Sequence, residues 1–404
     1  MTEPGLAVDS EALVWLQALL APDAQGGDGG GPVGRSDERW AVLPSARRPR
    51  VLVPLGARRA AAAMLARDSG FGARGRRLLG LAFRFGVTPA GLGGRMLVPA
   101  GHSFTPWIAE LLDEPNLVTG LTIGPPRPNR KPVVQLIRPD GTTAAWAKVS
   151  CTPLTTALVT NEGDWLERIE RAGPRTPAGR TIEAPRVLAR VRWHDLDVLV
   201  IAPLPERTRT AKVFAPDADL LQTIAGLGET TSRWVPRSPW WTALHQRAVA
   251  VTDAYGREVL DGALAAIGER LAPVTWRFGA WHGDLTFWNT RTCGPITQIW
   301  DWERAAGQRP VGFDAAHASF QAAQVGQGLG VSRAAAAADQ AVAPVLADLD
   351  LDPAHSADLV TCYLRERWLR WDEDARLGSG TVSSDRHAAI LAAIGKRHQR
   401  GPVA

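Results

Sequence analysis

Cysteine is scarce in this sequence, and its three copies lie far apart. Cys151, Cys293 and Cys362 form no C-x-x-C pair and show no zinc-ligand spacing. An odd count without such spacing argues against a disulfide framework and against a cysteine zinc site. We therefore expect a protein of the reducing cytoplasm.

Long apolar runs are also missing. No stretch approaches the ~18 consecutive apolar residues that a membrane span needs. The first five residues, M-T-E-P-G, carry no basic start, and no long apolar stretch follows them, so we expect no signal peptide. These absences predict a chain without a transmembrane segment.

Lysine is the third scarce residue. Only four of the 46 basic residues are lysine, namely Lys131, Lys148, Lys212 and Lys396. The formal net charge is modest, +5, and no stripe of basic residues alternates with aromatic ones. Because no nucleic-acid-binding motif matches either, we expect no nucleic acid partner.

Two catalytic signatures are absent as well. Without G-x-x-x-x-G-K-[ST] the chain is not a P-loop kinase, and without G-x-S-x-G it has no serine hydrolase elbow. With 404 residues, 45% of them hydrophobic, the chain can bury a large core as one bilobal unit or as two to three domains. The function must therefore be sought in other motifs.

One polar turn has the residues of a reaction centre. The run Trp281–Asn289 reads W-H-G-D-L-T-F-W-N, and I-W-D-W-E follows at 299–303. Asp301 stands 17 positions after Asp284, a spacing that fits a loop, a short hairpin and a return. Two carboxylates and the Asn289 carboxamide would then converge, as a magnesium-dependent phosphoryl transferase requires.

This pattern resembles the aminoglycoside phosphotransferase and choline kinase-like family, which shares the protein-kinase fold. The motif is H-G-D-x-x-x-x-N followed by a hydrophobic residue and D-W-E, with Gly283 where protein kinases have arginine. The resemblance implies that Asp284 is the catalytic base and that Asn289 and Asp301 bind magnesium. It also implies that His282 and Asp314 are structural, with Asp314 capping a helix and bracing the catalytic loop.

The resemblance also implies an α+β, bilobal, protein-kinase-like fold. We expect a small lobe with a five-stranded antiparallel sheet and one helix, a mainly helical C-terminal lobe, and an extra N-terminal segment. The expected division is 1–38 (helix and glycine-rich linker), 39–116 (extension), 117–205 (small lobe), 206–390 (helical lobe with the catalytic loop) and 391–404 (tail).

Lys148 and Glu162 are the expected ion pair of the small lobe. Strand alternation puts Lys148 on the face opposite Ala147 and Val149, and a helix capped by Thr152 follows. At ~100° per residue Glu162 falls within the apolar stripe of that helix, where a carboxylate needs a cationic partner. In kinases such a lysine holds the α- and β-phosphates; a surface salt bridge is the alternative.

Two further stretches are expected to contact the nucleotide. In kinase-fold proteins the chain after the last strand binds adenine, which here means Ala202, Pro203 and Leu204; proline has no N–H, so Leu204 is the expected donor. The stretch before the hairpin lacks G-x-G-x-x-G. Its residues Asn129 and Arg130, with Lys131, either contact the phosphates or form an ordinary basic turn.

The N-terminal third shows no chemistry. We expect helices at 10–22, with Ser10 as its cap, and at 58–67 and 105–112, a strand at 50–55, and a linker at 26–34. The basic and apolar run 76–85 fits a buried helix better than a membrane-surface contact.

In the C-terminal lobe a long helix at 240–271 is expected to break or kink near Gly256 and Gly262.

These expectations combine into one function with one rival. The chain would be a transferase, a kinase that uses ATP or GTP with Mg²⁺ and phosphorylates a hydroxyl group. The acceptor would be a sugar, an aminoglycoside-like molecule, a lipid head group or a peptide Ser/Thr. Trp234, Trp240 and Trp241 either stack on it or belong to the core. The rival is a catalytically silent, kinase-fold nucleotide-binding or scaffold module.

Overall fold

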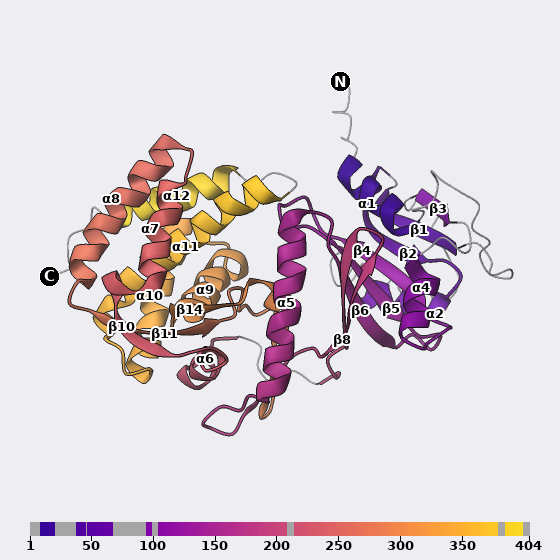
Figure 1. The fold of residues 1–404 in the computed structure, drawn as a ribbon, viewed down its shortest axis with the longest axis horizontal. Helices are drawn as coiled ribbons and strands as arrows, with labels where there is room; N and C mark the ends of the chain where they lie inside the picture. The colour runs from indigo at the N-terminus through magenta and orange to yellow at the C-terminus, as the bar shows by residue number, and fades with distance from the viewer. Residues whose placement is uncertain are drawn as a thin grey trace. The chain divides into compact units, whose positions relative to one another are not determined.

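The structure is a computed structural model (Figure 1). It describes residues 9–20, 38–45, 47–67, 94–98, 104–207, 214–378 and 384–398. The expected linker at 26–34 and the expected helix at 76–85 lie outside the described residues. None of the described helices is long and apolar enough to cross a membrane.

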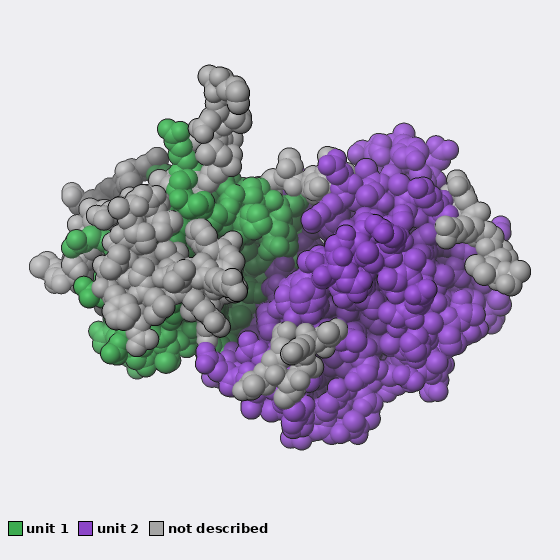
Figure 2. Space-filling model, turned by 180° about the vertical axis from the view of Figure 1, so that it is seen from behind, with its two compact units in different colours: residues 1–159, 187–203 green, residues 160–186, 204–404 purple. Residues whose placement is uncertain are grey.

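The chain divides into two compact units, coloured separately in Figure 2. Unit 1 comprises residues 1–159 and 187–203, and unit 2 comprises residues 160–186 and 204–404. Helix α5 (Pro153–Ala172) begins in unit 1 and continues in unit 2. Each unit is described by itself below.

Unit 1 is built on an antiparallel sheet whose strands run in the order β3-β1-β2-β4-β5-β6-β9-β8. Five of these strands come from residues 117–205, as expected, and three come from the N-terminal extension. β2 pairs with β4 through Val51↔Thr122 and Leu52↔Leu121, so the extension continues the sheet. The strands are β1 (Glu38–Ser45), β2 (Arg48–Pro54), β3 (Gly94–Val98), β4 (Val118–Ile123), β5 (Pro132–Ile137), β6 (Thr143–Val149), β8 (Val187–Trp193) and β9 (Leu196–Ile201).

Helices cover both faces of this sheet. One apolar cluster contains residues of α1 (Ser10–Leu20) and α4 (Phe104–Leu111), and the other contains residues of α2 (Arg58–Arg67). Alternation along β2 sends Leu52 to the first cluster and Val51 and Val53 to the second. The expected strand and helices of this region are therefore confirmed.

Arg130 is tied into this unit by an ion pair. Its guanidinium donates to both carboxylate oxygens of Asp9 at 3.0 and 2.8 Å, and it lies over the Trp15 ring, 5.3 Å from the centroid. Asp9 also accepts from the backbone N–H of Ala12, so Asp9, rather than Ser10, caps α1. Arg130 is buried, and this pairing favours the structural interpretation of the basic turn over a phosphate contact.

Unit 2 holds two small sheets and most of the helices. The sheets run β10-β11-β14 and β12-β13-β7. The strands are β7 (Thr181–Glu183), β10 (Thr231–Trp234), β11 (Thr275–Trp281), β12 (Thr290–Cys293), β13 (Ile296–Ile299) and β14 (Ala306–Pro310). The helices are α6 (Ala218–Ala225), α7 (Pro239–Val249), α8 (Ala254–Leu271), α9 (Phe313–Gln321), α10 (Val331–Asp348), α11 (Ser356–Leu377) and α12 (Ser384–His398), with short turns η1 (Val235–Arg237), η2 (Trp302–Arg304), η3 (Ala322–Gly326) and η4 (Pro353–His355).

The expected long helix at 240–271 is two helices, α7 and α8. The break falls at residues 250–253, where the Asp253 side chain accepts from the backbone N–H of Gly256 at 2.8 Å and caps α8. Helix α8 then runs through Gly256 and Gly262, so the helix does not break at Gly262. The start of the second helix is set by the Asp253 cap rather than by a glycine. The α+β class, with an antiparallel sheet first and helices afterwards, is confirmed.

Replacing Asp9 with asparagine should destabilise unit 1. Burial would raise the pKa of Asp9, but its bonds to Arg130 and Arg50 hold the pKa at about 2, below its ordinary value of 3.8. A carboxylate whose pKa is lower in the folded state than in the unfolded state stabilises the fold at pH values above its unfolded pKa. That stabilisation is lost as the pH falls through the folded-state pKa. Denaturant unfolding should show Asp9→Asn less stable by about 2 kcal/mol at pH 7, with the difference shrinking between about pH 4 and pH 2.

The exposed Asp195, in the turn between β8 and β9, provides the control. Asp195→Asn should leave unfolding unchanged at both pH values. An Asp9→Asn protein as stable as the parent at pH 7 would contradict the role given to this ion pair.

Candidate active site

The catalytic segment begins where β11 ends. After Trp281 the chain turns through residues 282–289 and returns as the hairpin β12–β13, paired from Thr290↔Ile299 to Cys293↔Ile296. Asp301 follows the hairpin directly. The loop, short hairpin and return that the 17-residue spacing predicted are therefore confirmed.

Gly283 occupies a position that only glycine fits. Its φ is +79°, and a Cβ at this position would collide with the carbonyl group of Arg304, in the turn after Asp301. The absence of a side chain thus lets the segment that carries Asp284 pack directly on the segment that carries Asp301. An arginine, which protein kinases have at this point of the motif, would not fit.

Asp314 holds the backbone of the catalytic segment in place. Its two carboxylate oxygens accept the backbone N–H groups of His282, at 2.7 Å, and Gly283, at 3.0 Å. Burial raises the pKa of Asp314 to about 7, against the lowering effect of these two bonds. The expected brace is confirmed. The expected helix cap is wrong, because Gly312 holds the cap position of α9 and the carboxylate is directed to the loop instead.

His282 is a structural member of the loop, as expected. It is completely buried. Its Nε2 lies 3.1 Å from the carbonyl oxygen of Trp300, and its Nδ1 accepts from the backbone N–H of Asp284 at 3.1 Å. Both ring nitrogens are thus engaged by backbone groups of the two segments, and the ring is not placed to carry a proton to a substrate.

Asp284 and Asn289 are brought together. The Asn289 amide nitrogen donates to the Asp284 side chain at 2.9 Å and to its backbone carbonyl at 3.0 Å. Because the NH₂ group faces Asp284, the amide oxygen of Asn289 is directed away from it. The backbone of Asn289 also accepts from the N–H of Trp300 at 3.1 Å, which ties it to the residue before Asp301.

Asp284 also has partners that the sequence analysis missed. His317 of α9 lies with Nε2 2.9 Å from Oδ1 of Asp284, and Arg370 of α11 donates to the carbonyl oxygen of Gly283 at 2.9 Å. Burial would raise the pKa of Asp284, but the hydrogen bond from His317 and the positive charge of Arg370 hold it below the ordinary value. No motif marked these residues, because they come from helices 30 to 90 positions downstream.

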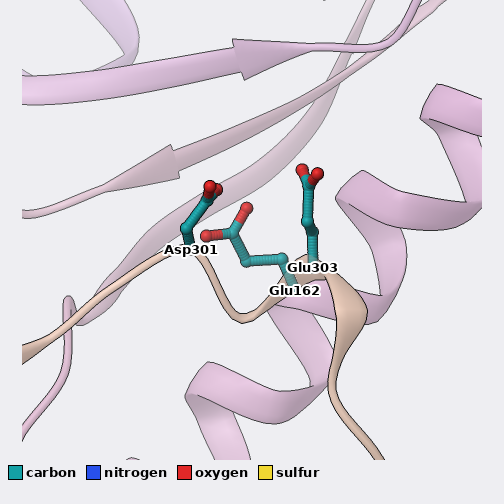
Figure 3. A group of neighbouring side chains, drawn as sticks. All are labelled: Glu162, Asp301 and Glu303. Carbon is teal, nitrogen blue, oxygen red and sulfur yellow. The ribbon is translucent and has the colours of Figure 1, made fainter. Parts of the chain in front are cut away.

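Three carboxylates meet beside the hairpin. Oxygen atoms of Glu162, Asp301 and Glu303 all lie within 4.8 Å of one another, and Glu162 and Glu303 are buried. Figure 3 shows Glu162 on helix α5 and the other two on the segment after β13. The predicted burial of Glu162 on the apolar stripe is confirmed, since its helix neighbours Trp165, Leu166 and Ile169 are buried too.

This donor set suits a hard divalent cation. Carboxylate oxygens are the ligands that Mg²⁺ prefers, and clustered carboxylates disfavour one another unless a cation compensates their charge. Within the described residues this is the cluster of His, Cys, Asp and Glu side chains close enough to hold one ion. Asp301, with φ +70° in the left-handed region, is fixed at the turn that presents it.

The remaining predicted residues lie in unit 1 or at the passage between the units. Lys148, on β6, is nearly buried, and Ala145, Ala147 and Val149 face the core cluster on the opposite side of the strand. Ala202 and Leu204 lie in the segment where the chain passes from unit 1 to unit 2. Asn129 is half-buried in unit 1. The roles of these residues toward a nucleotide stay predictions.

The tryptophans divide clearly between core and surface. Trp240 and Trp241 are buried and belong to the core, whereas Trp234 is half exposed and carries Arg237 over its ring. Trp288, inside the catalytic segment, is exposed at 39%, and its ring centroid lies 4.7 Å from that of Phe287. The catalytic segment therefore carries an exposed aromatic ring of its own, whereas Trp240 and Trp241 are core residues.

Comparisons with known proteins give a likeness of fold. No family model and no curated protein matches the sequence. Among solved structures, a thermostable mutant of aminoglycoside phosphotransferase APH(4)-Ia in ternary complex with ADP and hygromycin B matches at 13% identity, over 73% of this chain and 97% of that chain, with a TM-score of 0.47.

Two other matches are of the same class. Amicoumacin kinase hAmiN in complex with AMP-PNP, Ca²⁺ and Ami is 12% identical over 70% of this chain and 89% of its own, with a TM-score of 0.42. ADP-bound aminoglycoside phosphotransferase APH(2'')-Ib is 9% identical over 72% and 95%, with a TM-score of 0.43. At such identities and scores, the site must be judged from this chain's own residues.

Replacing Gly283 with alanine should damage the site far more than the same change at Gly294. Both residues have positive φ, +79° and +61°, but a Cβ at Gly294 meets nothing within 4 Å. Gly294→Ala should cost only the left-handed strain, about 1 kcal/mol. Gly283→Ala adds the collision with Arg304 and should cost about 3 kcal/mol in all.

Thermal unfolding of the two variants measures this difference. Equal shifts of Tm in both would show that the close approach of Gly283 to Arg304 does not constrain the fold.

Proposed function

We propose that this protein is an ATP- and Mg²⁺-dependent phosphotransferase that moves the γ-phosphate to a hydroxyl group of an acceptor. One observation carries the proposal: a fixed Asp284–Asn289 pair, 2.9 Å apart, is tied through Trp300 to the turn that presents the Glu162, Asp301 and Glu303 carboxylates. Phosphoryl transfer needs an oriented base beside metal-binding oxygens and little other chemistry from the protein.

Asp284 is the residue that orients the acceptor hydroxyl and takes its proton. Its side chain is 30% exposed, with Oδ1 facing His317 and Oδ2 accepting from Asn289, so the carboxylate keeps lone pairs open to an acceptor hydroxyl. The depressed pKa keeps the carboxylate ionised at neutral pH, in the state that accepts a proton.

Asp301 and the amide oxygen of Asn289 are the proposed metal ligands, and Glu303 and Glu162 supply further carboxylate oxygens close to Asp301. A bound Mg²⁺ would neutralise charge on the nucleotide phosphates. The protein's own contribution is to hold these oxygens on two segments joined by two hydrogen bonds of 3.1 Å. The backbone N–H of Trp300 donates to the carbonyl oxygen of Asn289, and the ring Nε2 of His282 lies against the carbonyl oxygen of Trp300.

The nucleotide contacts are proposed from unit 1 and the passage between the units. Lys148 would hold the α- and β-phosphates, and the backbone at Ala202 and Leu204 would bind adenine. Asn129 and Lys131 are the remaining phosphate candidates, since Arg130 is paired with Asp9. GTP is the second nucleotide to test.

The acceptor class is the most open part of the proposal. The matched structures include complexes with hygromycin B and with Ami. Here Trp288 offers an exposed aromatic face four residues after Asp284, which suits the apolar face of a sugar ring. A saccharide or another hydroxyl-bearing small molecule is therefore favoured, and a lipid head group and a peptide Ser/Thr remain in the panel.

Replacing Asp284 with asparagine should abolish transfer. The amide cannot take the hydroxyl proton, so kcat should fall by about 10²- to 10⁴-fold, the usual contribution of a general base. The measurement is Mg²⁺-dependent turnover of ATP and GTP over a panel of sugars, aminoglycosides and hydroxyl peptides. Asp348→Asn, an exposed change at the end of α10, should leave kcat unchanged.

Wild-type protein that binds the nucleotide with Mg²⁺ but transfers no phosphate to any acceptor would favour the silent binding module. Protein that binds no nucleotide would overturn the proposal.

Replacing Asp301 with asparagine should weaken metal binding, because it removes one of three converging carboxylates. Titration with Mn²⁺, followed by electron paramagnetic resonance, should show affinity falling by at least about tenfold, and Glu303→Gln should weaken it less. Glu170→Gln, an exposed change on the same helix as Glu162, is the matched control. Unchanged Mn²⁺ affinity in Asp301→Asn would remove this cluster from the site.

A further inference from the structure

A chain of buried hydrogen bonds runs from helix α11 to the candidate base. Arg367 lies with Nη1 3.1 Å from the hydroxyl oxygen of Tyr363, and that hydroxyl lies 2.9 Å from Nδ1 of His317. Nε2 of His317 lies 2.9 Å from Oδ1 of Asp284. His317, Tyr363 and Arg367 are all buried.

The donor and acceptor properties of these groups fix the direction of each hydrogen bond in this chain. A guanidinium only donates, so the Tyr363 oxygen accepts from Arg367. The tyrosine proton must then be donated elsewhere, and its partner in the chain is Nδ1 of His317. With Nδ1 accepting, the neutral imidazole carries its proton on Nε2 and donates it to Asp284.

We propose that His317 is a positioning residue for Asp284, held by Tyr363 and Arg367 in the one tautomer that donates Nε2–H to Oδ1 of the base. The inference deepens the proposed function and rests on it. It assigns roles to three residues that lie outside the motif.

The surroundings of His317 support a neutral ring. Burial lowers its pKa to about 4 despite the neighbouring Asp284, and Arg367 and Arg370 act in the same direction as burial. The charged groups that face the pair are Arg367 and Arg370 from α11, with Arg304 and Asp314 acting on Asp284 from η2 and α9. A neutral imidazole at pH 7 has one N–H, and the position of that proton decides whether Asp284 receives a donor.

Two donors from different elements fix the carboxylate plane. His317 of α9 holds Oδ1, and Asn289 of the catalytic segment holds Oδ2. A carboxylate with a single donor can turn about its χ2 torsion, which is broad for aspartate. With both donors present, the open edge of Asp284 keeps one direction, and a base must lie within hydrogen-bond reach of its proton in a defined direction.

The test compares three variants. His317→Phe keeps a ring but removes the donor, His317→Gln keeps an N–H near the position of Nε2, and Tyr363→Phe removes only the hydroxyl that sets the tautomer. We expect kcat to fall about 10- to 100-fold in His317→Phe with KM little changed, the effect typical of removing a partner that orients a reactive group. His317→Gln should recover most of kcat, and Tyr363→Phe should fall between them. Tyr255→Phe, at the exposed tyrosine, is the matched control.

A spectroscopic readout does not depend on turnover. In protein with ¹⁵N-labelled histidine, the signals that disappear in His317→Gln belong to His317, and they should show Nδ1 unprotonated and Nε2 protonated. Tyr363→Phe leaves Nδ1 only the longer contact with Nη1 of Arg367, at 3.4 Å, and should shift the ring toward a mixture of tautomers. A crystal structure of His317→Phe should show the Asp284 carboxylate turned from its present plane, and that of His317→Gln should show it retained.

Three results would overturn the proposal: a protonated Nδ1 in the parent protein, an unchanged kcat in His317→Phe, or equal losses of kcat and Tm in His317→Phe and His317→Gln. If the parent protein transfers no phosphate to any acceptor, the proposed function fails. The tautomer and the Asp284 plane then still decide whether His317 positions this carboxylate.

Discussion

The carboxylate of Asp314, accepting the backbone N–H groups of His282 and Gly283, is the interaction on which the candidate site depends. A catalytic loop has backbone groups that neither helix nor sheet satisfies, and leaving them buried without partners costs free energy. Asp314 satisfies two of them and sets the direction in which the chain leaves β11. Asp284 is the next residue, so its position follows from this brace. Gly283 completes the arrangement, since only a residue without a side chain lets Arg304 and the Asp301 turn approach the loop.

Much of this site could be read from the sequence, because its members are local. Asp284, Asn289 and Asp301 lie within one loop and one hairpin, whose spacing fixes their approach. Glu162 could be placed because helical periodicity alone decides which of its acidic neighbours is buried. His317 and Arg370 could not be found in this way. Their contacts depend on how α9 and α11 pack against the loop, and nothing in their local sequence distinguishes a core histidine from one that holds a carboxylate.

In the fold, too, single helices and strands could be predicted from the local sequence, whereas contacts between distant segments could not. The helix at 58–67 and the strand near 50–55 were predicted from local pattern and are confirmed. That β2 pairs with β4, so that the N-terminal extension belongs to the sheet of the small lobe, is a contact between residues about 70 positions apart, which alternation does not encode. Arg130 was assigned a possible phosphate contact for a related reason: its partner Asp9 lies 121 positions away. A basic residue in a turn looks free until the segment that neutralises it is placed.

The arginine bias of the sequence has a physical use in unit 2. Arg367 of α11 is buried beside His317, the half-buried Arg370 acts on Asp284 and Asp314, and Arg304 pairs with Asp374 at 2.9 Å. Isolated buried carboxylates would take up protons, whereas nearby guanidinium groups favour their charged forms. Arginine suits this task better than lysine, because its charge is retained on burial and its fork reaches several acceptors at once. Arg370 illustrates both properties, with one nitrogen bonded to the Gly283 carbonyl oxygen and its charge lowering the pKa of Asp284. Helix α11, remote in sequence, thus adds to the hydrogen bond from His317 in holding the pKa of the candidate base below its ordinary value.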